Sequence, residues 1–154
     1  MSDTPYDSTA DTQAHIERVN ELLTKVATEL AFRSLMHDAS KLKEPEKSVF
    51  DAVTPKLKAL TYGSPEYMGQ LAHMREALEH HYRTNRHHPE FYAAGVEGMT
   101  LIDLVEMLCD WKAATERHAD GDLAWSIEIN AERFKIPPVI VDILRNTAKE
   151  LKLL

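Results

Sequence analysis

Apolar residues recur at helical spacing in the first quarter of the chain. Between residues 16 and 30 they fall three or four positions apart, at Ile16, Val19, Leu22, Leu23, Val26 and Leu30. This spacing predicts an amphipathic helix from about residue 11, after a flexible polar lead-in over residues 1–10. A second apolar segment, residues 30–36, leads directly into the adjacent pair His37-Asp38.

Turn and cap residues divide the rest of the chain into further predicted helices. These helices cover residues 45–53, 65–86, 100–118, 123–135 and 139–151. Pro55 should end or kink the first of them, residues 61–63 form a turn, and Ser64 should cap the second. Thr100 and Asp103 have the spacing of a capping box at the third. No strand alternation is present, so the sequence predicts an all-α single-domain bundle of six to seven helices over residues 11–154.

Composition and charge narrow the classes of function. The chain has 154 residues, of which 44% are hydrophobic and 28% charged, and its net charge is -7. This balance is typical of a globular domain and argues against a nucleic acid polymer as partner. Cys109 is the one cysteine, and no long apolar stretch or leader segment stands out. A cytoplasmic protein without a membrane partner is therefore expected.

A line of carboxylates crosses the most apolar predicted helix, residues 100–118. Asp103, Glu106 and Asp110 stand at positions i, i+3 and i+7, so they share one face. On an arbitrary helix this face would simply meet solvent. Apolar residues cover nearly all the rest of the circumference, however, which is typical of a helix at the centre of a fold. Buried carboxylates need a partner or a metal, so this line predicts a cation site.

Four of the eight histidines lie between residues 80 and 88. If the helix reaches that far, His81, Asn85 and His88 share one face, and His80 and His87 form a second line beside it. Two imidazoles on one face are a common way to hold a divalent metal. The alternative is an exposed helix end, where histidines favour the negative end of the helix dipole. The cluster predicts that at least one of these histidines is functional.

The pair His37-Asp38, with Lys41 three residues on, gains weight from a histidine upstream and an aspartate on a later helix. This order resembles the HD-domain superfamily of metal-dependent phosphohydrolases. The resemblance implies His15 as the first histidine and Asp110 as the last aspartate. One straight helix would place His15 about 33 Å from His37 at 1.5 Å per residue. A shared metal therefore requires a break or bend between residues 27 and 34, which we predict.

The chain is most similar to a small uncharacterised HD-like family of bacteria and phages. The similarity lies in residues 37–42 (HDASKL), 81–92 (HYRTNRHHPEFY) and 106–114 (EMLCDWKAA). It implies one or two divalent transition metal ions, from among Mn, Fe, Co, Ni and Zn. The expected ligands are His15, His37, Asp38, Asp110, His81 and His88.

The resemblance also implies roles around the metal. Asp38, Lys41 and Glu106 are the expected catalytic residues, with Glu106 a candidate to orient a ligand histidine. Related nucleotidases have a carboxylate where this chain has Lys41, so a carboxylate base would have to come from elsewhere. The candidates for such a base are Glu44, Glu46 and Glu106. The expected substrate-binding residues are Lys41, Arg86, His87 and Arg117.

Three functions are compatible with these patterns. The first is a phosphohydrolase acting on a nucleotide or another small phosphate ester through a metal-activated water. The second is an HD-type di-iron oxygenase, which the extra histidines His81 and His87 or His88 favour. The third is a non-catalytic helical protein that uses its metal structurally. Relatives in the superfamily often form dimers, so a homodimer is expected by analogy.

Overall fold

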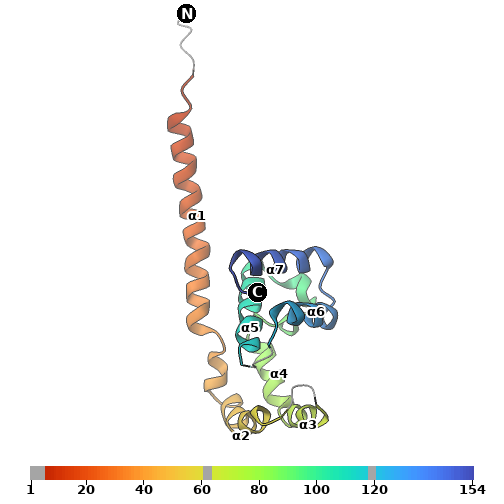
Figure 1. The fold of residues 1–154 in the computed structure, drawn as a ribbon. Helices are drawn as coiled ribbons and strands as arrows, with labels where there is room; N and C mark the ends of the chain where they lie inside the picture. The colour runs from red at the N-terminus through yellow and green to blue at the C-terminus, as the bar shows by residue number, and fades with distance from the viewer. Residues whose placement is uncertain (1–5, 61–63, 118–120) are drawn as a thin grey trace, which may run out of the picture. The chain divides into compact units, whose positions relative to one another are not determined.

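The computed structural model describes residues 6–60, 64–117 and 121–154 (Figure 1). Within these residues the chain forms seven α-helices and three short 3-10 helices, without a strand, which confirms the predicted all-α class. The expected turn at 61–63 and the expected helix end at His118 lie outside the described residues. The helices are α1 Thr9–Met36, η1 Ala39–Leu42, α2 Glu46–Lys58, α3 Pro65–His73, α4 Arg75–Thr84, η2 Pro89–Phe91, η3 Gly95–Gly98, α5 Leu101–Thr115, α6 Leu123–Phe134 and α7 Pro138–Glu150.

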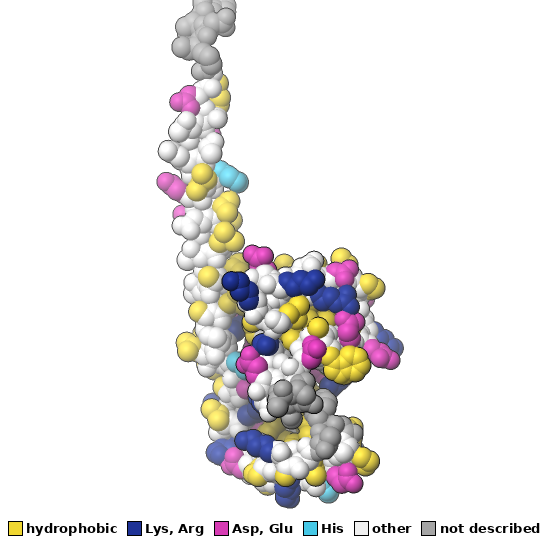
Figure 2. All heavy atoms as spheres, in the orientation of Figure 1, with side chains coloured by type: hydrophobic (Ala, Val, Ile, Leu, Met, Phe, Trp, Pro, Cys, Tyr) yellow, Lys and Arg dark blue, Asp and Glu magenta, His cyan; other side chains and the backbone are white. Residues whose placement is uncertain are grey.

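The chain divides into two compact units, Met1–Leu35 and Met36–Leu154. Helix α1 makes up the first unit, and hydrophobic side chains lie along it (Figure 2). It is one continuous helix, so the predicted break between residues 27 and 34 is wrong. The reason is local: residues 9–36 contain neither glycine nor proline. The hydroxyls of Thr24 and Thr28 bond to carbonyls one turn earlier and leave the helix intact.

In the second unit, α5, α6 and α7 pack together around the hydrophobic core (Figure 1). Ile127 and Ala148 are fully buried there, and Met107 and Leu108 are almost so. The predicted capping box at the start of α5 is present, because the Thr100 hydroxyl accepts from the Asp103 N–H. The core thus fixes α5, and α5 carries two of the candidate site residues.

Helices α2, α3 and α4 pack against one another as the second part of this unit. Ser64 caps α3 as predicted, accepting from Tyr67 N at 3.1 Å. The long helix expected over residues 65–86 is wrong, because Met74 separates α3 from α4. Met74 is only 2% exposed, so packing of its side chain accompanies the break, without glycine or proline. Pro55 was predicted to end or kink the helix over residues 45–53, and the helix does not end there, since α2 continues through Pro55 to Lys58.

The surface and the helix lengths add two observations. On the face in Figure 2, acidic and basic side chains are interspersed over the second unit, with apolar side chains between them. None of the described helices combines the length and the apolar character needed to cross a membrane.

Candidate metal centre

Asp38 stands at a backbone position that few side chains adopt. It follows the end of α1 closely and caps η1 with φ 57°, in the left-handed region that aspartate tolerates better than most residues. Lys41 holds it from one side: its N–H donates to the Asp38 carbonyl at 2.9 Å, and Nζ donates to Oδ2 at 2.5 Å. The other carboxylate oxygen, Oδ1, is buried. Strained backbone of this kind is common at functional sites.

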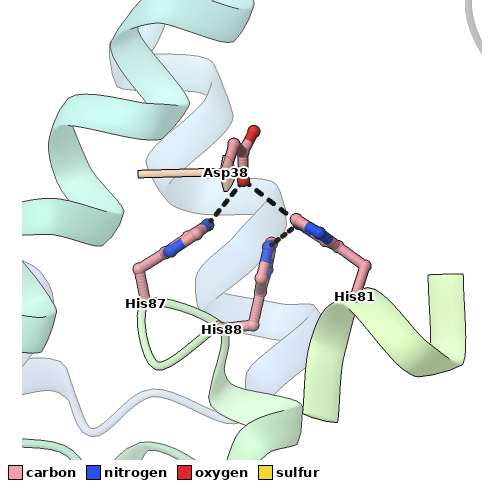
Figure 3. Close-up of side chains that lie close together, drawn as sticks. All are labelled: Asp38, His81, His87 and His88. Atoms are coloured by element: carbon pink, nitrogen blue, oxygen red, sulfur yellow. Dashed lines mark hydrogen bonds and ion pairs between the residues drawn. The ribbon is translucent and has the colours of Figure 1, made fainter. Parts of the chain in front are cut away.

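The three imidazoles opposite Asp38 come from the end of α4 and the turn that follows. Helix α4 ends at Thr84, because Asn85 adopts an extended backbone and its Nδ2 donates to the His81 carbonyl at 2.8 Å. His87 and His88 therefore lie on the turn after the helix, and the condition under which His81 and His88 would share one helix face is not met. The turn nevertheless folds back, so that all three rings point toward Asp38 (Figure 3).

Asp38, His81, His87 and His88 form a cluster that we call the His81 group. Asp38 Oδ1 lies 3.2 Å from His81 Nε2 and 3.5 Å from His87 Nε2, and the Nε2 atoms of His81 and His88 are 2.9 Å apart. Adjacent ligands bound at about 2.0–2.1 Å around one metal lie roughly 2.9–3.4 Å apart. Two of these separations fall within this range and the third, 3.5 Å, lies just above it, so the cluster suits a single divalent ion.

Two atoms of the His81 group are buried without a hydrogen-bond partner among the described residues. They are Asp38 Oδ1 and His87 Nε2, and they face each other at 3.5 Å. His81 and His87 are each 1% exposed. A buried polar atom without a partner costs free energy, and native proteins contain few of them. The donor set, three imidazoles and one carboxylate, fits a divalent transition metal.

A second cluster, the His37 group, consists of His37, His87 and Asp110 and shares His87 with the first. His37 Nε2 lies 3.5 Å from Asp110 Oδ1, and His37 Nδ1 lies 3.0 Å from Glu106 Oε1. Contacts with Asp110 and then Glu106 raise the pKa of His37 to about 10, although burial opposes this. Without a metal, His37 is thus a protonated imidazolium at neutral pH.

Burial and charge act differently on the other groups of the site. Burial, followed by the neighbouring His87 and His81, lowers the pKa of His88 to about 3, so this imidazole is neutral at pH 7. Burial alone would raise the pKa of Asp38, but the contacts with His81 and Lys41 outweigh it and lower that pKa. Burial alone would also raise the pKa of Asp110, but the contact with His37 lowers that pKa. Both aspartates are therefore carboxylates at neutral pH.

Two glutamates stand behind the imidazoles. Glu106 Oε1 lies 3.0 Å from Nδ1 of His37 and 3.3 Å from Nδ1 of His87, so it holds both rings from the side away from Asp38. Glu46 is fully buried and contacts His81 Nδ1 at 2.9 Å. The sequence offered Glu46 only as a candidate base, since nothing in its spacing connects it with a histidine 35 residues later.

The three carboxylates along one face of α5 have two different roles. Glu106 and Asp110 reach the site, whereas Asp103 is fully buried and holds the helix start. Asp103 Oδ2 accepts from the Tyr92 hydroxyl at 2.7 Å, and Oδ1 lies 3.4 Å from Arg86 Nε. Arg86, predicted to bind substrate, is thus paired with a structural carboxylate outside both clusters.

The remaining predicted residues lie at different places. Lys41 is beside Asp38 and 30% exposed, which suits its predicted contact with substrate. Arg117 is exposed and lies just past the end of α5. His15 belongs to α1 in the first unit, 21 residues before Met36, about 32 Å along a continuous helix. It belongs to neither cluster, and the residues of both clusters lie in the second unit.

Comparison with known proteins identifies the family. No curated protein and no solved structure matches the chain. The resemblance to HD-domain phosphohydrolases therefore stays a prediction. A family model described as a family of unknown function, DUF5662, matches residues 4–150. Because the match covers nearly the whole chain, the protein belongs to the DUF5662 family.

Proposed function

We propose that this protein is a metal-dependent hydrolase that cleaves a small phosphate ester, with a nucleotide as the preferred class of substrate. The observation that supports it most is the His81 group. Three imidazoles and a carboxylate point at one another at the separations of ligands around one ion. Two of the facing atoms are buried without a hydrogen-bond partner among the described residues.

The donor set and its neighbours match what phosphoester hydrolysis needs. A divalent metal held by these residues lowers the pKa of a bound water toward neutrality and polarises a phosphoryl oxygen. Asp38 and the imidazoles supply the ligands, and Asp110 places a further carboxylate beside His37. Lys41 Nζ lies at Asp38 Oδ2, 30% exposed, where its ammonium would pair with a phosphate oxygen.

A second candidate is an oxygenase with two iron ions, as predicted from the extra histidines. The observation in its favour is the His37 group, which adds a second set of ligands next to the first. Both sets include His87, however, and a single nitrogen binds a single metal. Two ions would thus have to divide the remaining ligands of the two groups between them.

The experiment combines metal analysis with two activity assays. The purified protein is loaded in turn with Mn, Fe, Co, Ni and Zn, dialysed, and analysed for bound metal. Each form is then assayed for phosphate release from a panel of nucleotides and phosphomonoesters, and for oxygen consumption with the same compounds. The chelator-treated protein is the control.

The hydrolase proposal expects metal-dependent phosphate release without oxygen consumption. Oxygen consumption by a protein with two irons and no phosphate release would establish the second candidate instead. Metal binding without either activity would leave a structural site, and absence of metal binding would contradict both enzymes.

A further inference from the structure

Glu46 is a carboxylate that is completely buried at the start of α2, yet both of its oxygens have partners. Oε1 lies 2.7 Å from Nδ1 of His80, and Oε2 lies 2.9 Å from Nδ1 of His81. The Ser40 hydroxyl donates to Oε2, also at 2.9 Å. Placing a carboxylate in this position is costly unless its partners are donors, so these contacts constrain where the protons are.

The hydrogen atoms around His81 Nδ1 can be assigned one by one. The Asn85 amide has two hydrogens, which reach the Ser40 hydroxyl and the His81 carbonyl, each at 2.8 Å. The single Ser40 hydrogen is used by Glu46. Asn85 Nδ2 and Ser40 Oγ also lie 2.9 Å and 3.2 Å from His81 Nδ1, but with their hydrogens used at the shorter contacts neither has one left for it. The proton between His81 and Glu46 must therefore be carried by Nδ1 of the imidazole.

The assignment determines the other side of the ring. With a proton on Nδ1, the lone pair that a metal needs can come only from Nε2, and His81 Nε2 faces Asp38 Oδ1 at 3.2 Å inside the His81 group. Glu46 thus keeps the ligand nitrogen of His81 ready for a metal.

We infer that Glu46, assisted by Ser40, is a positioning residue that holds the His81 proton on Nδ1 and directs Nε2 into the metal centre. This inference rests on the proposed function, because it assigns Glu46 a role toward the same ion. Carboxylates that accept from a ligand histidine orient its ring, and their loss typically weakens metal binding about 10- to 100-fold. Glu46 touches neither the facing ligand atoms nor Lys41, so its effect passes through His81.

The variant Glu46→Gln separates orientation from packing. Glutamine preserves the volume, but it offers one acceptor oxygen where Glu46 serves His80 and His81 with two. One of these imidazoles then meets an amide N–H, which favours moving its proton to Nε2. Glu44→Gln is the matched control, because Glu44 is exposed and its carboxylate accepts from the Ser48 hydroxyl and not from a histidine.

Two measurements test the inference, with Co²⁺ as the probe. Long-range ¹H–¹⁵N NMR correlations of the metal-free protein report which nitrogen of His81 carries the proton. Titration with Co²⁺ gives the dissociation constant and the visible absorption spectrum of the bound ion, which depends on ligand geometry. Circular dichroism and thermal unfolding show whether each variant is folded. Ser40→Ala and Ser40→Thr add a loss and a rescue of the hydroxyl that supports Glu46.

The expected result is a wild-type His81 protonated at Nδ1, and a folded Glu46→Gln with about 10- to 100-fold weaker Co²⁺ binding and an altered spectrum. Ser40→Ala should show a smaller loss that Ser40→Thr restores, and Glu44→Gln should match the wild type. A wild-type His81 protonated at Nε2 instead of Nδ1, or unchanged Co²⁺ binding by Glu46→Gln, would overturn the inference. A wild type that binds no Co²⁺ would instead remove the proposed function, whatever the His81 tautomer. If Glu46→Gln does not fold, the inference is tested by the wild-type His81 tautomer and by Co²⁺ binding of Ser40→Ala and Ser40→Thr.

Discussion

The His81 group and the His37 group place the same side chain, imidazole, in opposite electrostatic surroundings. His88 is half-buried beside two other imidazoles, and its pKa falls to about 3. His37 lies between Asp110 and Glu106, and its pKa rises to about 10. At neutral pH the first group therefore contributes a neutral ring and the second a cation, although His87 belongs to both.

This difference shows which ligands are prepared for a metal. A histidine binds a metal through a neutral nitrogen, so His88 is already in the required state. His37 must first release a proton that two carboxylates hold in place. We infer that the His81 group is the primary binding site and that an ion reaching His37 competes with this proton.

The largest expected effect follows from removing the carboxylate that faces both groups. Asp38→Asn keeps the size of the side chain and tolerates the left-handed backbone, but it removes the charge that the metal would neutralise. We expect metal affinity to fall by about 100-fold or more and phosphate release to be lost. The loss of affinity is measured as the metal content of the protein after dialysis.

Asp51→Asn is the matched control, because Asp51 is exposed and pairs with Lys47 on the same helix. An Asp38→Asn protein that retained its metal and its turnover would show that the ion, if any, is bound elsewhere.

The next effect concerns the acceptor that both groups share. In the wild type, the Glu106 carboxylate contacts Nδ1 of both His37 and His87. Glu106→Gln replaces this carboxylate with an amide, which has one acceptor oxygen. We expect metal affinity to decrease about 10- to 100-fold. Isothermal titration should also show fewer protons released on binding, because His37 loses one of the carboxylates that raise its pKa. Glu116→Gln, with its exposed pairing to Lys112, should match the wild type in both measurements.

Features that depend on neighbours in sequence could be predicted. The Ser64 cap and the capping box of Thr100 and Asp103 involve residues three positions apart, and both are present. His37, Asp38 and Asp110 were candidates for the same reason: each stands out against an apolar helix. His37 Nε2 lies 3.8 Å from Asp38 Oδ2 and 3.5 Å from Asp110 Oδ1.

Features that depend on tertiary packing could not be predicted from the sequence. Nothing local distinguishes Met74, which separates α3 from α4, from an ordinary helical methionine. The sequence left open whether the helix reaches His88, because the contact of Asn85 with Ser40, 45 residues away, cannot be read from it. Glu46 was missed as a partner of His81 for the same reason. His15 was chosen by order in the chain alone, and α1 contains no break that would return it.

A smaller effect is expected at the edge of the site. Lys41→Met keeps much of the aliphatic stem beside Phe50 and removes the ammonium at Asp38 Oδ2. We expect KM for a phosphate ester to rise about 10-fold, the value of one charge-assisted bond, with metal content unchanged. Lys43→Met, an exposed neighbour, is the control. A fall in kcat at constant KM would assign Lys41 to the chemical step instead.

The smallest expected effects are changes of a few degrees in Tm, and they test the difference between His37 and His88 in the metal-free protein. The pKa of His37 is raised from 6.5 to about 10, so its stabilising contribution is complete below pH 6.5 and is lost as pH rises toward 10. The pKa of His88 is lowered from 6.5 to about 3, so its neutral form stabilises above pH 6.5, and this is lost as pH falls toward 3.

The Tm difference between the wild type and His37→Gln should therefore shrink on the alkaline side, and that between the wild type and His88→Gln on the acid side. Thermal unfolding in chelator across this pH range measures both. Two differences that change in the same direction would mean that the imidazoles share one environment. The distinction between a prepared ligand and a protonated one would then have no basis.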